Sequence, residues 1–200
     1  MSRRIALLRA VNVGGTKALP MARLREVAAG LGLGAPQTVL QSGNLVFEGG
    51  DAGEAELEAR LERALAAEAG LATAVLVRDA PAWARLIADN PLAEAAAAAP
   101  ARVLAVCLKG EPSDADLEQL RALRRDGEHV EGRGRVIYAG FPHGLGRSRL
   151  ATALSSGRGL AGTGRNWNTV RRIAACLEGR VGDEANCPLR SGGGASTSSP

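Results

Sequence analysis

The residues of this sequence that could perform chemistry lie in four short polar segments. The first is Asn12-Val13-Gly14-Gly15-Thr16-Lys17, which follows a short apolar run. Backbone N–H groups of the paired glycines Gly14 and Gly15 can converge on an anion, Lys17 adds positive charge, and Asn12 is a further candidate binding residue. The spacing is not that of a phosphate-binding P-loop. A wide turn that needs positive φ angles at the two glycines is the alternative, and we favour it for this segment.

The second segment, Gln41-Ser42-Gly43-Asn44, places two amides and a hydroxyl around one predicted hairpin turn. Side chains such as Gln41, Ser42 and Asn44 read nucleobases, or they hold their own turn by hydrogen bonds to its backbone. We predict that the first and third strands here run parallel. The turn is then expected at the opposite end of the sheet from the Asn12 loop, so the two segments are not expected to form one site.

The third segment, residues 143–149, is the strongest candidate for an anion site. Gly144 and Gly146 precede a predicted helix, Ser148 is its candidate cap, and Arg147 and Arg149 flank that serine. A helix dipole, free N–H groups and two guanidinium groups therefore coincide. An ordinary glycine loop with a capping serine is the alternative.

The fourth segment, Arg165-Asn166-Trp167-Asn168, precedes the last predicted helix. Arg165 adds another positive charge, and Asn166 or Asn168 is expected to cap the helix. Trp167 either stacks on a nucleobase or on Arg165, or packs the helix against the core. We favour packing for this residue.

Catalytic and metal-binding groups are scarce. The chain has three widely spaced cysteines and two histidines, which predicts no metal site and no disulfide framework, and we expect no cofactor. Cys107 and Cys176 are predicted to be buried and inert. No pair of carboxylates lies among the basic segments for acid–base work. Lys17 and His143 are the only candidate reactive groups.

Charge is distributed unevenly along the chain, although the net charge is only +4. Residues 1–47 contain six basic residues and one acidic residue, whereas residues 48–131 contain nine basic and seventeen acidic residues. Residues 132–177 contain eight arginines and no acidic residue. An anionic ligand or partner would require such segregation. Arginines scattered over solvent-exposed faces are the alternative.

Periodicity predicts the elements that must position these segments. Strands are expected at residues 5–8, 38–40, 45–47 and 73–77, and amphipathic helices at 20–31 and 54–68. The order βαββαβ recurs after residue 102, with a weak last strand near 160–161. The sequence therefore predicts an α+β fold of two ferredoxin-like (βαββαβ) repeats, residues 1–78 and 102–185. A helical linker, residues 79–101, is expected between them.

Residues 186–200 are rich in glycine, serine and threonine and are predicted to form a disordered C-terminal tail. Such a composition has nothing to bury. Deleting these residues is therefore expected to leave the thermal midpoint unchanged within error. A clear drop in the midpoint would show that the tail docks on the folded protein.

Four sequence stretches resemble a bacterial family named domain of unknown function 1697. They are IALLRAVNVGGTKALPMARLREVAAGLGL, QSGNLVF, GRSRL and RNWNTV, in the order of that family. The resemblance covers nearly the whole chain except the tail. It implies an α+β fold with two ferredoxin-like repeats and implies no activity. Ala10 stands where the family usually has glycine, and Arg149 replaces a usual lysine and keeps the charge.

Three classes of function remain open from the sequence. The leading hypothesis is a binding module for a phosphate-bearing ligand or nucleic acid, although an aromatic content of 2% argues against stacking many bases. The second is a small enzyme acting on a phosphorylated or acidic metabolite, and the third is a protein-interaction scaffold. The apolar run near the N-terminus is too short for a signal peptide or a membrane span. We therefore expect a cytoplasmic protein without membrane contact.

Overall fold

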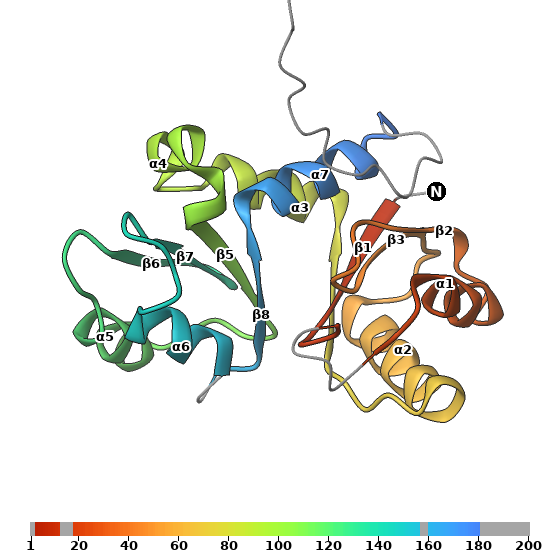
Figure 1. The fold of residues 1–200 in the computed structure, drawn as a ribbon. Coiled ribbons are helices and arrows are strands. Elements are labelled where there is room, and N and C mark those ends of the chain that lie inside the picture. The colour runs from red at the N-terminus through yellow and green to blue at the C-terminus, as the bar shows by residue number, and fades with distance from the viewer. Residues whose placement is uncertain (1–2, 13–17, 157–159, 181–200) are drawn as a thin grey trace, which may run out of the picture.

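The N-terminal part of the chain forms a four-stranded antiparallel sheet, here called the N-terminal sheet (Figure 1). The computed structural model describes residues 3–12, 18–156 and 160–180. The sheet is ordered β2-β3-β1-β4. Its elements are β1 (Arg3–Leu8), α1 (Met21–Gly30), β2 (Gly34–Thr38), β3 (Asn44–Glu48), α2 (Glu54–Ala69) and β4 (Val75–Asp79). Helices α1 and α2 cover one face, because alternate strand residues such as Ala6 and Leu8 point toward them.

The C-terminal sheet has the same relative strand order, β6-β7-β5-β8, and is also antiparallel throughout. Its elements are β5 (Val103–Leu108), α5 (Asp114–Ala122), β6 (His129–Arg133), β7 (Val136–Gly140), α6 (Arg149–Ser156) and β8 (Gly162–Asn166). Helices α5 and α6 cover its outer face with a core that includes Leu120, Leu150 and Leu154. Ser113 and Asp116 form a capping box at the start of α5, since they exchange both hydrogen bonds.

The inner faces of the two sheets share a third core with α3 (Ala80–Ala88) and α7 (Trp167–Leu177). Figure 1 shows these helices between the two sheets, with α1 and α2 on one side and α5 and α6 on the other. Trp83 is 1% exposed, and its indole N–H donates to the carbonyl of Val170 at 3.2 Å. The two sheets are thus joined by a continuous apolar core.

The chain crosses from one sheet to the other through α3, α4 (Ala93–Ala98) and a short 3-10 helix (Pro100–Arg102). Asp79 caps α3, because its carboxylate accepts the N–H of Ala82 at 2.7 Å, and Pro81 occupies the first turn. No helix in the described residues is long and apolar enough to cross a membrane.

Two strands differ from their predicted positions. The strand expected at 38–40 is β2, which spans Gly34–Thr38; the chain then turns, with Leu40 at a φ angle of 60°. The strand expected near 160–161 is β8, which begins at Gly162 and includes Arg165 and Asn166. Its sequence, GTGRN, has no apolar periodicity. It forms a strand because it pairs with Leu104–Leu108 of β5.

Candidate functional site

The end of β1 and the turn before β3 meet in space. The side-chain amide of Asn12 donates to the carbonyls of Gln41 at 2.7 Å and of Leu19 at 3.0 Å. The prediction that these two segments lie at opposite ends of the sheet is wrong. Strands β1 and β3 are antiparallel neighbours, with Leu7 opposite Asn44, so the end of one adjoins the start of the other.

Arg165 of β8 reaches this same place from the C-terminal sheet. Its Nε donates to Oδ1 of Asn44 at 2.5 Å, and its Nη2 donates to the carbonyls of Leu8 at 2.9 Å and of Ser42 at 3.0 Å. Its Nη1 donates to Thr163 Oγ1 and to a backbone carbonyl of its own strand. All guanidinium nitrogens are therefore engaged inside the protein.

The surroundings of this guanidinium are buried. Arg165 is 8% exposed and Asn44 is fully buried, and the Asn44 amide in turn donates to Val39 O and Ser42 Oγ. Burial lowers the pKa of Arg165 to about 10, so the group stays charged at neutral pH. From the sequence, Arg165 is expected to be a positive charge available to a ligand, in a segment before the last helix. The structure instead places it in a strand that fastens one sheet to the other.

Arg78 of β4 makes the reciprocal contact, which sequence reasoning missed. Arg78 lies opposite Ile5 in β1, and Arg165 lies opposite Ala105 in β5; each partner is the third residue of its strand. The guanidinium of Arg78 donates to the carbonyl of Leu108, the last residue of β5. Arg165 contacts the last residue of β1 in the same way. The sequence did contain a signal for this contact, because Arg78 is a charged residue within the apolar run of β4.

The residues that follow β1 and β5 also cross between the sheets. Arg9 donates to the carbonyl of Ser156 at the end of α6, at 2.8 Å. Lys109 lies 2.8 Å from Glu62 and 3.5 Å from Glu58, both on α2. Each strand-end cation therefore contacts a helix of the other sheet. We call this set of cross-sheet contacts, made by Arg9, Arg78, Lys109 and Arg165, the junction.

Residues 144–149 form the loop before α6 and its first residue, and no hydrogen bond or ion pair between described residues joins them to the four junction residues. Ser148 is buried and caps the helix as predicted, because its Oγ accepts the N–H of Ala151 at 3.0 Å. Gly144 has a φ of 86°, which the loop requires, and Gly146 is exposed. Arg147 and Arg149 are exposed, and neither forms an ion pair with any described residue.

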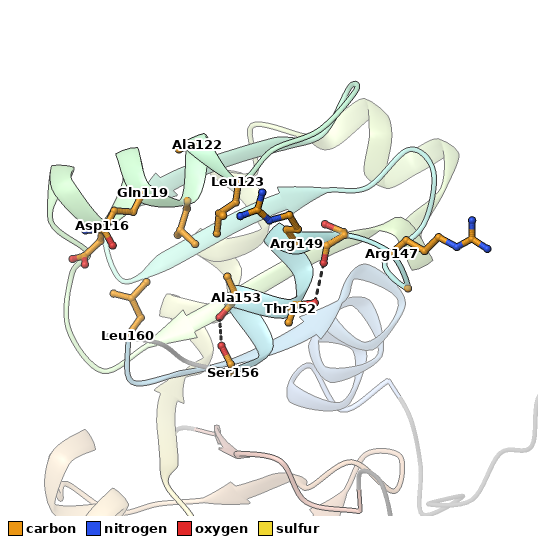
Figure 2. Close-up of a pocket in the computed structure, with 13 residues that line it drawn as sticks. Asp116, Gln119, Ala122, Leu123, Arg147, Arg149, Thr152, Ala153, Ser156 and Leu160 are labelled. Carbon is orange, nitrogen blue, oxygen red and sulfur yellow. Dashed lines mark hydrogen bonds between the residues drawn. The ribbon is translucent and has the colours of Figure 1, made fainter.

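A cleft of about 710 Å³ lies between α5 and α6, beside these arginines. Figure 2 shows Arg149 close to Leu123, whereas the side chain of Arg147 points away from α5. Ser156, the residue that Arg9 contacts, also lines this cleft. A smaller hollow of about 480 Å³ shares Arg147 and Ser148 and is lined by His143.

At the start of α7, the structure agrees with the interpretation that an asparagine caps the helix and Trp167 packs against the core. Asn166 is the N-cap, and its Oδ1 accepts from the N–H and the hydroxyl of Thr169, each at 3.0 Å. Trp167 is buried in the core between the sheets. Asn168 is exposed. Gly14, Gly15 and Lys17 lie outside the described residues.

The arginines of the acid-free stretch divide into two groups. Arg133 and Arg135 pair with Glu131 and Glu54 at 3.3 and 2.9 Å, and Arg165 is used in the junction. The remaining described arginines of this stretch have no acidic partner within the described chain: Arg147, Arg149, Arg171 and Arg172. Most of the charge there is therefore not neutralised by the acidic middle segment.

The described cysteines and metal-ligating side chains do not form a second candidate site. Cys107 and Cys176 are buried free thiols, and burial raises the pKa of Cys107 to about 11, which keeps it protonated. The described residues contain no cluster of three or more His, Cys, Asp or Glu side chains that could hold a metal ion.

Comparisons with known proteins agree with this architecture. A search of curated proteins yields no match. A solved structure of a conserved bacterial protein from Streptococcus pneumoniae is similar, with a TM-score of 0.67. The match covers 88% of this chain and 98% of that chain at 21% identity, a likeness of fold. The family model described as protein of unknown function (DUF1697) matches residues 1–138, more than half of the chain. This protein therefore belongs to the DUF1697 family.

Proposed function

We propose that this protein binds a phosphate-bearing ligand in the cleft between α5 and α6. The observation that carries the proposal is the pair of arginines at the start of α6. Arg147 and Arg149 line the cleft and lack an acidic partner among the described residues. Guanidinium groups bind phosphate oxygens through paired, charge-assisted hydrogen bonds.

The backbone at the same point supports the proposal. The N–H group of Arg149, an exposed residue that lines the cleft, has no acceptor among the described residues, whereas the N–H of Ala151 is bound by Ser148. It lies in the first turn of α6, where the helix dipole favours negative charge. The fixed capping by Ser148 holds this turn in place before any ligand arrives.

The junction is a less suitable place for such a ligand. Its best cation, Arg165, already donates to six acceptors in the protein, and Arg78 is only 4% exposed. An anion there would have to break existing hydrogen bonds before it gained new ones. The unpaired charge at the cleft carries no such cost.

Charge reversal at the cleft tests the proposal. Arg147→Glu/Arg149→Glu is expected to elute from a phosphocellulose column at much lower salt than the wild type. The slope of the logarithm of the binding constant against the logarithm of salt concentration should decrease in magnitude by about one for each lost phosphate contact. Retention is measured over a salt gradient, with circular dichroism to verify folding.

The matched control is Arg171→Glu/Arg172→Glu on α7, which changes the net charge by the same amount at unpaired arginines outside the cleft. The control is expected to keep most of the wild-type retention. Equal losses in the two double variants would mean that net charge alone binds the resin. Unchanged retention in the cleft variant would exclude this site.

We also propose that the chain consists of two ferredoxin-like repeats, residues 1–78 and 102–185, joined by the helical linker 79–101. The identical relative strand orders and the equivalent positions of Arg78 and Arg165 support this division. A cytoplasmic location is the setting we propose, and the free thiols of Cys107 and Cys176 are compatible with it.

A further inference from the structure

We infer that the ligand of the α5–α6 cleft is a small phosphate monoester with a nonpolar organic group, and not a polynucleotide. This inference rests on the proposed function and specifies its ligand. The cleft volume, about 710 Å³, lies within the range of about 300–1,000 Å³ that is common for small-molecule sites.

The cleft is larger and more apolar than a phosphate ion needs. Beyond the two arginines, its walls include Leu120 and Leu123 from the α5 side and Ala153 and Leu160 from the α6 side. Figure 2 shows Leu123 and Ala153 on opposite sides of the cleft, with Arg149 near both. A ligand whose phosphate meets Arg149 would place its organic group between these walls, where burial of apolar surface favours binding.

The far end of the cleft is acidic. Asp116 and Gln119, in the first turns of α5, line it at the end opposite Arg147 (Figure 2). Hydrogen bonds from the hydroxyl and the backbone N–H of Ser113 lower the pKa of Asp116, so the carboxylate is charged at neutral pH. The arginines attract a phosphate at one end of the cleft, whereas Asp116 would repel a second phosphate at the other end. A polymer with a phosphate at every nucleotide requires a basic track instead.

The burial of the aromatic side chains is a further argument against a polynucleotide ligand. Proteins that bind single-stranded nucleic acid stack bases on exposed rings. All aromatic residues of this chain are at most 7% exposed: Phe47, Trp83, Tyr138, Phe141 and Trp167. None of them lines the cleft, so a nucleobase would find no ring to stack on there.

Calorimetric titration with three probes tests the inference: inorganic phosphate, butyl phosphate and a ten-residue oligothymidylate. Butyl phosphate is expected to bind wild-type protein about tenfold more tightly than inorganic phosphate, or better, because its methylene groups leave water. The oligothymidylate is expected to bind no more tightly than butyl phosphate. Because this ratio is measured on the unmodified protein, it does not depend on the folding of any variant.

Two variants locate the effect. Leu123→Ser is expected to abolish the preference for butyl phosphate while inorganic phosphate still binds. Leu40→Ser, at an exposed leucine in the turn between β2 and β3, should leave the preference intact. Equal affinities for both phosphates, with binding lost in Arg147→Glu/Arg149→Glu, would overturn this inference and leave the proposed function standing. Tighter, steeply salt-dependent binding of the oligothymidylate would also overturn it. No binding of any probe would remove both proposals.

Discussion

Arg165→Met is expected to lower the free energy of unfolding by about 3–5 kcal/mol, since each buried acceptor left without a donor costs about 1–3 kcal/mol. Methionine keeps most of the length and apolar volume of arginine but offers no N–H group. The carbonyl of Leu8 and Oδ1 of Asn44 would each lose a donor in a region where both residues are fully buried. The measurement is urea unfolding followed by circular dichroism.

The thermal midpoint should fall with the same substitution, by roughly 10 °C for a chain of this size. Arg147→Met is the matched control, because it removes the same charge from an exposed side chain without an ion pair among the described residues. That control is expected to stay within about 0.5 kcal/mol of wild type. If Arg165→Met also stayed within about 1 kcal/mol, the junction would not be what holds the sheets together.

Local patterns in the sequence were enough to place most of the helices. The leucine stripe at residues 57, 61 and 65 predicts a helix over 54–68, and α2 spans Glu54–Ala69. The caps at Asp79 and Ser113 are readable for the same reason, since a cap bonds to N–H groups only two or three residues away. Information of this kind lies within one helical turn of the chain.

The junction was not predictable, because its contacts depend on how two sheets face each other. Arg165 contacts Leu8 across 157 positions of sequence, and nothing local to GTGRN indicates a strand. The error over Asn12 and Gln41 came from assigning the wrong relative direction to the first and third strands. Once β1 and β3 are antiparallel, the contact between these segments follows directly.

The cleft was predictable on one side only. The glycines and arginines of residues 144–149 stand out in the sequence because local charge and helix capping coincide there. The opposite wall comes from α5, about thirty residues earlier, where Asp116 and Leu120 read as an ordinary amphipathic helix. The pairing of α5 with α6 across one face of the C-terminal sheet decides that these residues border the cleft.

The second substitution with a large expected effect is Arg78→Met, which should cost about 3–5 kcal/mol because it breaks a buried charge network. Arg78 donates to the carbonyl of Leu108 and lies 3.6 Å from Glu54 and 3.9 Å from Glu58. Without Arg78, the largely buried carboxylate of Glu58 would have one cationic partner left among the described residues, Lys109 at 3.5 Å. The loss is again measured as the free energy of unfolding in urea.

Two further variants distinguish the effect of breaking the Arg78 network from the effect of removing one positive charge. Arg78→Lys should recover part of the stability, because one ammonium group cannot reach both Leu108 O and the α2 carboxylates as a guanidinium does. Arg121→Met removes an exposed pair with Glu118 and is expected to cost at most about 1 kcal/mol. A cost for Arg78→Met as small as that for Arg121→Met would contradict the network. The junction would then rest on the contacts of Arg9, Lys109 and Arg165.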